Sequence, residues 1–319
     1  MNHRVADDDT TLRIGELTID NPLVFAPIAG YSDLPFRRMA RRHGAGFVVT
    51  ELVSVEGIVR NNKKTMDLLA FHEEERPMGI QIFGRNPETM AEAAKRVEDL
   101  GPDFIDINMG CPATKVCKGG EGAGSALLRD PSLAGAIVTE VVKAVSLPVT
   151  AKIRIGWNEG ERNYNEIIPA LEDGGVSLIA IHGRTKVQGY TGLADWDAIE
   201  EAAALATVPV VGNGDILTHE QAMERLKGSN CRGIMIGRGA CGNPWIFTGH
   251  NPSPKEVFDQ VMEHLEMSLE HYGPWGLVLM RKHMAKYIHG FRNASSIRHR
   301  LMTTEDPKEV ADILGEILL

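Results

Sequence analysis

The sequence predicts an α/β protein, a (β/α)8 TIM barrel followed by a small C-terminal domain made only of helices. Short β-rich runs and helical segments alternate eight times before residue 250. The runs are almost continuously apolar, as expected for parallel strands that helices cover on both faces. Residues 255–319 contain no strand pattern and are typical of amphipathic helices. We therefore expect a disordered tail at 1–11, the barrel at 12–250 and the helical domain at 251–319.

The strand-helix units have the lengths that a closed barrel requires. Eight units in about 225 residues match a fold that typically takes ~250 residues. Predicted helices at 87–100 and 131–145 each begin with a proline, which suits the first helical position. A doubly wound open sheet is the alternative, but it calls for a G-x-G-x-x-G turn after the first strand, and 26–30 is not one. The predicted strands are 23–27, 47–50, 79–83, 104–108, 149–154, 178–182, 208–212 and 233–237.

Composition narrows the class of protein. The 319 residues are 43% hydrophobic and 24% charged, which is typical of soluble domains, and no apolar run approaches the roughly 20 residues that span a bilayer. Because the first residues are polar, we expect no signal peptide there. The cysteines Cys111, Cys117, Cys231 and Cys241 form no disulfide framework for a chain of this size. We therefore expect a cytoplasmic protein, and we expect it to be a monomer. We also expect no metal, because the sequence has no H-x3-H or H-E-x-x-H motif.

Polar residues follow nearly every predicted strand. In barrels of this type the active site is built at the C-terminal ends of the strands. We therefore expect these side chains to meet at one rim. In strand order they are Pro27-Ile28-Ala29-Gly30, Glu51, Gln81, Asn108 with Cys111, Lys152 with Arg154, His182-Gly183-Arg184, Asn213-Gly214-Asp215 and Gly237-Arg238-Gly239.

The last two strand ends predict a phosphate site. Barrels often bind phosphate with the loops after strands seven and eight. Glycines there let backbone N–H groups approach an anion, and Arg238 adds a positive charge. The alternative is that these glycines only form tight turns. The glycines are Gly212, Gly214, Gly237 and Gly239.

Three further rim residues suit a flat, electron-rich ligand. Lys152 lies inside an apolar strand, where a lysine either faces the barrel mouth or pays the cost of a buried charge. It suits a Schiff base, a cation against a cofactor, or an ion pair with an acid such as Glu51. Gln81 and Asn213 offer amide donors and acceptors for a heterocycle. His182 suits a phosphate contact, an acid, or a bond to the backbone. Together with the phosphate site, this set fits flavin mononucleotide (FMN).

A thiol and a carboxamide follow the fourth strand, in Asn108-Met109-Gly110-Cys111-Pro112. Loops at strand ends of a rigid scaffold often carry chemistry. The alternative for Cys111 is a buried structural cysteine beside a turn.

At this point the chain resembles the tRNA-dihydrouridine synthases, and most closely their bacterial B branch. The resemblance rests chiefly on Asn108-Met109-Gly110-Cys111-Pro112 and His182-Gly183-Arg184-Thr185, and it extends from about Leu12 to the C-terminal helices. It implies an enzyme that uses NADPH to reduce FMN and then reduces a uridine of the tRNA D-loop, with Cys111 as proton donor. It implies that Asn108 and Arg184 contact the substrate. The residues that it implies for flavin binding are Pro27, Ile28, Ala29, Gln81, Lys152, His182, Asn213, Gly214, Asp215, Gly237 and Arg238.

Two segments depart from the barrel pattern. The loop 115–125 is about two residues longer than the family pattern, and its glycines predict a mobile lid over Cys111. Within a chain of net charge -9, residues 271–304 contain no acidic residue. Such clustered cations are typical of an RNA-binding face, whereas a solvated helix surface is the alternative. We expect tRNA contacts from Arg281, Lys282, Lys286 and Arg298.

Two other functions stay open at this level. One is an FMN-dependent oxidoreductase that acts on a free small molecule, of the dihydroorotate dehydrogenase kind. The other is a non-catalytic RNA-binding protein that has kept the barrel.

Overall fold

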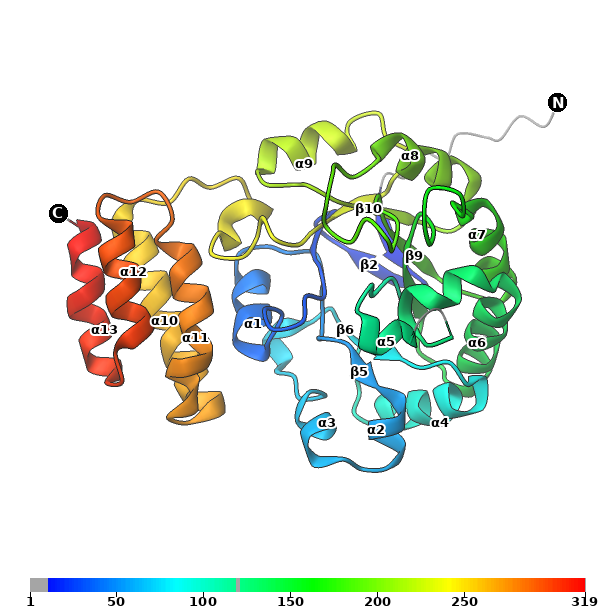
Figure 1. Ribbon diagram of the computed structural model, residues 1–319, viewed down its shortest axis with the longest axis horizontal. Helices are drawn as coiled ribbons and strands as arrows, with labels where there is room; N and C mark the ends of the chain where they lie inside the picture. The colour runs from blue at the N-terminus through cyan, green and yellow to red at the C-terminus, as the bar shows by residue number, and fades with distance from the viewer. Residues whose placement is uncertain (1–10, 119–120, 319) are drawn as a thin grey trace.

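The structure is a computed structural model that describes residues 11–118 and 121–318. Figure 1 shows a barrel ringed by helices, with the C-terminal helices packed together on one side of it. Apart from Thr11, the predicted disordered tail at 1–11 lies outside the described residues. None of the helices in the described ranges has the length and apolar character needed to cross a membrane.

The described strands form the predicted parallel barrel. They are β3 (Leu23–Phe25), β4 (Val48–Val49), β6 (Met78–Phe83), β7 (Phe104–Met109), β8 (Val149–Arg154), β9 (Leu178–His182), β10 (Val210–Asn213) and β11 (Gly233–Ile236). Each pairs with the next one in the order β3-β11-β10-β9-β8-β7-β6-β4, and a short strand β5 (Val53–Ser54) also pairs with β6. Backbone bonds from Gly46 N to Leu23 O (2.8 Å) and from Phe25 N to Phe47 O (3.1 Å) close the ring. The open-sheet alternative is therefore wrong.

Helices cover the outside of the barrel. They are α1 (Leu34–Arg42), α2 (Val55–Val59), α3 (Lys63–Asp67), α4 (Pro87–Glu98), α6 (Pro131–Ala144), α7 (Tyr164–Asp173), α8 (Trp196–Leu205) and α9 (His219–Leu226). The short helix α5 (Thr114–Cys117) instead belongs to the loop after β7. The helices α4 and α6 begin where the prolines predicted. Asn86 accepts a bond from Thr89 N and Asp130 from Leu133 N, so each helix has an N-cap side chain directly before its proline.

A hairpin that the sequence analysis did not predict closes the N-terminal end of the barrel. Strands β1 (Leu12–Ile14) and β2 (Leu17–Ile19) pair antiparallel around a two-residue loop that begins at Gly15, where φ is 57°. Leu12, Ile14 and Ile19 are buried with inward side chains of the barrel strands. The hairpin therefore forms an apolar floor beneath the barrel.

Strand alternation layers the barrel interior above this floor. Successive side chains of a strand point to opposite faces, so Phe104, Asp106 and Asn108 of β7 share the inner face. Phe104 belongs to the apolar floor. Asp106 accepts bonds from Gln81 Nε2 and Thr150 Oγ1, both at 2.6 Å, which makes a buried polar layer. The next inward residues of these strands therefore reach the open C-terminal end.

The C-terminal region is helical, as predicted. Its helices are α10 (Pro254–Tyr272), α11 (Trp275–Tyr287), α12 (Ala294–Thr303) and α13 (Pro307–Leu314). Helix α10 packs against α1 of the barrel, with ion pairs from Arg42 to Glu263 and from Arg38 to Glu270. These contacts place α11 beside the open end of the barrel (Figure 1).

Candidate active site

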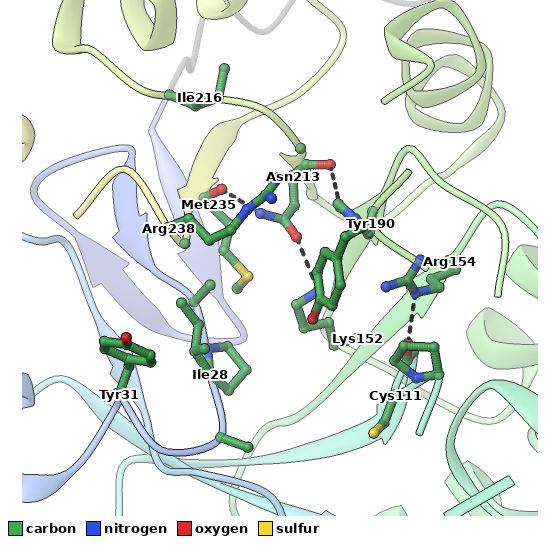
Figure 2. A pocket seen from close by; sticks show the side chains of 18 of the residues that line it. Ile28, Tyr31, Cys111, Lys152, Arg154, Tyr190, Asn213, Ile216, Met235 and Arg238 are labelled. Carbon is green, nitrogen blue, oxygen red and sulfur yellow. Dashed lines mark hydrogen bonds between the residues drawn. The ribbon is translucent and has the colours of Figure 1, made fainter. Parts of the chain in front are cut away.

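A cavity of about 500 Å³ opens at the C-terminal end of the barrel. Its walls come from the strand ends that the sequence singled out, and Figure 2 shows Ile28 facing Lys152 and Cys111 across it. Every residue predicted to bind the flavin lines it, together with Cys111, Asn108 and Lys286. The flavin set in its wall is Pro27, Ile28, Ala29, Gln81, Lys152, His182, Asn213, Gly214, Asp215, Gly237 and Arg238.

Lys152 is a half-buried ammonium group in the wall of this cavity. Its Nζ donates to Asn213 Oδ1 at 3.1 Å, and no carboxylate of the described residues forms an ion pair with it. The ion pair with Glu51 that was open from the sequence is therefore not formed, and Glu51 instead accepts a bond from Gly30 N. Burial, and then the charge of Arg154, lower the pKa of Lys152 to about 8. An anionic ligand edge would supply the charge that Lys152 lacks.

The side-chain amides of Gln81 and Asn213 each make one donated and one accepted hydrogen bond within the protein. Gln81 donates to Asp106 and accepts from Asn108 Nδ2 at 2.7 Å. Asn213 donates to Met235 O at 2.7 Å and accepts from Lys152. Each amide nitrogen has two N–H groups, so each side chain keeps one donor for a ligand. These networks fix the orientation of both donors before a ligand arrives.

The structure bears on two of the roles that the sequence leaves open for His182, a bond to the backbone and an acid. Its Nδ1 bonds the carbonyl of Asn213 at 3.0 Å, so Nδ1 carries the proton and Nε2 is an acceptor. Burial, followed by the charges of Lys152 and Arg154, lowers the pKa of His182 well below its ordinary value. A neutral imidazole of this tautomer is not an acid near neutral pH. The buried Nε2 lines the cavity and has no partner within the described residues, so it is free to accept a bond from a ligand.

The loop after β10 is a charged, strained turn. Gly214 has φ 144°, and a Cβ there would lie 2.4 Å from the Cβ of Ala194. The next residue, Asp215, also has a positive φ, of 53°, an uncommon conformation that clusters at functional sites. Asp215 pairs with Arg184 at 2.6 Å and with Arg238 at 3.0 Å. Two cations on one carboxylate leave a net positive charge, as an anion site requires.

Hydrogen bonds fix the loop that carries Cys111. Asn108 Oδ1 accepts from the N–H groups of Gly110 (3.2 Å) and Cys111 (2.9 Å). Arg154 Nε donates to Gly110 O at 2.9 Å, and its Nη1 reaches Thr185 O and Gly189 O. Figure 2 shows this guanidinium next to the Cys111 segment. The thiol therefore stands on backbone that is bound on both sides, in the wall of the cavity.

Comparison with known proteins decides which family has this site. A family model described as "Dihydrouridine synthase (Dus)" matches residues 24–318. This chain belongs to that family. The resemblance and the TIM-barrel fold are confirmed, and dihydrouridine synthases are flavin-dependent oxidoreductases that reduce uridine in tRNA to dihydrouridine.

Relatives match along nearly the whole chain. A "Probable tRNA-dihydrouridine synthase" of Rhodobacter capsulatus is 44% identical over 311 residues, which cover 93% of this chain and 94% of that protein. A "tRNA-dihydrouridine synthase B" of Pseudomonas aeruginosa is 40% identical and covers 93% of this chain and 92% of its own. Histamine dehydrogenase from Rhizobium sp. 4-9 shares the fold with a TM-score of 0.58 at 15% identity, over 86% of this chain and 50% of that one.

The cavity of this dihydrouridine synthase fits a flavin. Lys152 lacks an anion, His182 Nε2 lacks a donor, and the net positive charge around Asp215 lies in the same wall. An electron-rich ring would meet the first two requirements, and an anionic group would meet the third.

Arg184 does not line the cavity, and its predicted contact with the substrate stays a prediction. Its side chain is 2% exposed and lies behind Asp215, outside the cavity wall. It also donates to Gly192 O at 2.6 Å and Thr191 O at 3.2 Å. A guanidinium that is buried and bound in this way positions Asp215 and the loop before α8.

The predicted RNA contacts divide into two sets. Lys286 is exposed and lines the cavity, and Arg298 is partly exposed and has no carboxylate partner in the described ranges. By contrast, Arg281 donates to Thr304 O at 2.8 Å, and Lys282 pairs with Asp33 at 3.2 Å. Both side chains already bond groups inside the protein, and their contacts with tRNA stay a prediction.

The lengthened loop is partly packed. Cys117 is buried, and its thiol donates to Cys111 O at 3.2 Å. Ser125 N also donates to Cys111 O, at 3.1 Å, and Ala123 N to Val116 O, at 3.0 Å. Residues 119–120 lie outside the described residues, so mobility of this loop stays a prediction. The described part of the loop holds Cys111 through the two bonds to its carbonyl oxygen.

Sequence reasoning missed several residues of the cavity wall. Arg154 was noted at a strand end but not assigned to the site, and Tyr31, Tyr190 and Cys241 were not singled out. The ring of Tyr190 lies 5.7 Å from the guanidinium of Arg154 and 5.3 Å from that of Arg238. A strand-end signal could have found Arg154. The tyrosines stand in loops, where sequence periodicity carries no positional information.

One cluster of metal-capable side chains occurs in the described part of the chain. Asp33, His264 and His283 each offer a ligand atom, and these atoms lie within 4.8 Å of one another. The cluster lies outside the cavity, where α10 and α11 meet α1. The absence of a metal stays a prediction.

Proposed function

We propose that this chain binds FMN in the barrel cavity, takes its electrons from NADPH, and reduces a D-loop uridine of tRNA with Cys111 as the proton donor. The observation that supports this proposal most directly is that one cavity at the open end of the barrel is lined by a thiol and by a half-buried ammonium group without a carboxylate partner among the described residues. Family membership supports the tRNA substrate and the flavin. The choice of FMN, of NADPH and of each residue is our inference.

The proposed cofactor contacts follow from the groups that the fold leaves unsatisfied. Lys152 holds the electron-rich edge of the ring, Gln81 and Asn213 donate their remaining N–H groups, and His182 Nε2 accepts a bond. Arg238 and the backbone at Gly214 and Gly237 hold the phosphate. The segment Pro27-Ile28-Ala29 forms the opposite wall. When bound, the flavin supplies the hydride that adds to one carbon of the uracil double bond.

Cys111 completes that reduction. Its thiol gives a proton to the neighbouring carbon, so the double bond gains one hydride and one proton, and the thiolate regains its proton from solvent. A positioned thiol is a workable general acid near neutral pH. The bonds from Asn108 and Arg154 to the loop keep the sulfur at one place in the wall, which is the contribution that proximity makes to such a step.

The RNA must deliver its base into a cavity inside the barrel rim. A base in a stack is inaccessible there, so the target uridine has to be splayed out of the RNA, as in other base-modifying enzymes. We propose that the region 251–319 is the RNA-binding domain and that Lys286 and Arg298 contact phosphates. Lys286 stands in the cavity wall, so it is placed to hold the backbone next to the splayed nucleotide.

The test compares substrates with purified protein. We expect a flavin absorption spectrum, bleaching by NADPH, and dihydrouridine in tRNA but not in free uridine. Turnover of free uridine or of another small molecule at a rate equal to that of tRNA would favour the small-molecule oxidoreductase. Colourless protein that binds tRNA but no added FMN would favour the non-catalytic RNA-binding protein.

A further inference from the structure

We infer that Lys282 and His283 of α11 are positioning residues for the flavin loop between β3 and α1. This inference rests on the proposed binding of flavin in the barrel cavity. The loop contains Pro27, Ile28 and Ala29, which form one wall of that cavity. The helical region would then contribute to cofactor binding as well as to RNA binding.

Asp33 is the link between the two regions. It is the N-cap of α1, where its side chain accepts from Phe36 N at 3.2 Å, and it is 8% exposed. Its Oδ2 lies 3.2 Å from Lys282 Nζ and 3.1 Å from His283 Nε2. The same carboxylate therefore begins a barrel helix and anchors two consecutive residues of α11.

The segment from Ile28 to Asp33 behaves as one unit because it is bonded to itself. Ser32 Oγ accepts from Ile28 N at 2.9 Å and donates to Ile28 O at 3.1 Å. The N–H groups of Tyr31 and Ser32 both bond Ile28 O at 2.9 Å. A displacement of Asp33 would consequently move Ile28, whose side chain faces into the cavity (Figure 2).

Tyr31 provides a second contact between α11 and this loop. It lines the cavity, its ring packs edge-on against the ring of His283 at 5.4 Å, and the ammonium of Lys282 lies 5.8 Å from its centroid. His283 is buried and also stacks on Phe36 at 5.1 Å. Lys282 and His283 thus touch the loop at Asp33, at Tyr31 and through the first turn of α1.

Charge explains why the loop depends on these contacts. Burial alone would raise the pKa of Asp33, but the hydrogen bond from His283 and the charges of His283, His264 and Lys282 hold that pKa well below its ordinary value. Removing one partner of a buried ion pair leaves the other charge uncompensated. The carboxylate would then be drawn toward water, and the bonded segment would follow it out of the geometry that lines the cavity.

The same contacts decide against Lys282 as an RNA contact. Its side chain is 29% exposed, and its ammonium faces Asp33. Lys286, one turn further along α11, is exposed and has no carboxylate partner among the described residues. A phosphate would therefore meet Lys286 without breaking an internal ion pair.

The experiment measures the dissociation constant of FMN by titrating flavin-free protein, with the thermal midpoint and the tRNA affinity measured in parallel. Lys282→Met should weaken FMN binding roughly tenfold, the order expected when a charge-assisted bond is lost. Lys282→Arg should restore it. Arg292→Met, which removes the same charge from an exposed position of the acid-free segment, should leave FMN affinity unchanged.

A double variant tests the pathway through Asp33. Asn at position 33 can still cap α1 but needs no cation, so Lys282→Met should have little further effect on FMN affinity in the Asp33→Asn background. Should Lys282→Met not fold, Lys282→Gln is measured in its place. Unchanged FMN affinity with weakened tRNA binding would overturn the inference and return Lys282 to the RNA contacts. Wild-type protein that binds no FMN would instead refute the proposed function.

Discussion

The ammonium of Lys152 lies 3.1 Å from the amide oxygen of Asn213, across one intervening strand of the barrel. Lys152 belongs to β8 and Asn213 to β10, with His182 of β9 between them. Lys152, Asn213 and His182 together present a cation, an amide N–H and a free acceptor to the cavity. The hydrogen bonds of Lys152 to Asn213 and of His182 to the Asn213 carbonyl form without a ligand, but no described carboxylate pairs with the positive charge of Lys152.

Lys152→Met should therefore separate stability from cofactor binding. The variant should lose most of its flavin, because a charge-assisted contact contributes roughly 1.5–3 kcal/mol. The flavin-free variant should be more stable at pH 7, because it no longer buries an ammonium whose pKa is lowered from 10.5 to about 8. That shift corresponds to a free energy of unfolding higher by on the order of 3 kcal/mol. Denaturant unfolding of both flavin-free proteins measures it, and full flavin occupancy in the variant would sink the assignment.

The pKa of Lys152 also predicts how cofactor affinity and stability depend on pH. The protonated lysine is the form that holds an anionic edge, so FMN affinity should be flat below about pH 8. Above that pH it should fall by up to about tenfold per pH unit, because binding then takes up a proton. In the flavin-free protein, the cost of the buried cation is fully present below about 8 and is relieved as the pH rises toward 10.5. A pH-independent FMN affinity up to pH 9.5 would contradict this role.

Charge reversal on the helical region should distinguish RNA contacts from internal ones. Lys286→Glu with Arg298→Glu should weaken tRNA binding and flatten the plot of log affinity against log salt by roughly 0.7–0.9 per lost phosphate contact. Arg281→Met should lower the thermal midpoint and leave that slope unchanged, because its guanidinium holds Thr304 O at the end of α12. If Arg281→Met changes the slope and the double variant does not, the RNA lies on a different face.

Arg154→Met should impair the step that uses Cys111 more than flavin reduction. Within the described residues its guanidinium donates to backbone carbonyls alone, at Gly110, Thr185 and Gly189. Its loss should let the thiol shift, and misplacements of about 1 Å can cost on the order of 100-fold. We expect dihydrouridine formation to slow by about 10- to 100-fold, with NADPH-driven flavin reduction changed less than about twofold. Arg129→Met, an exposed arginine that pairs with Glu161, is the control, and equal loss in both half-reactions would argue against a positioning role.

The barrel and most of its rim could be predicted because strand periodicity determines them. Once β7 and β8 are placed, alternation sends Asn108 and Lys152 inward at the same level, where they are register partners. The N-terminal hairpin was missed although Leu12–Ile19 alternates around a Gly-Glu loop, because three-residue strands carry a weak signal.

Partners across the fold could not be predicted from local sequence. The charge of Lys282 is visible in the sequence, but Asp33, its partner, comes from the other end of the chain, and the Asp33–His283 bond spans 250 residues. Arg184 follows a strand end as predicted, yet its orientation depends on Asp215, which lies on the next loop. The sequence therefore shows how many cations the helical region has, whereas the structure shows which of them already bond groups inside the protein.

The most direct test compares two cysteines that lie in the same loop region. Cys111 stands in the cavity wall, whereas Cys117 is buried, and burial raises the pKa of its thiol. Dihydrouridine formed in a single turnover is measured after NADPH has reduced the flavin of each variant. We predict that Cys111→Ala keeps its flavin and is reduced by NADPH but forms almost no dihydrouridine, while Cys117→Ala stays substantially active. Wild-type yield from Cys111→Ala, with loss of product in Cys117→Ala, would contradict the assignment of Cys111 as the proton donor.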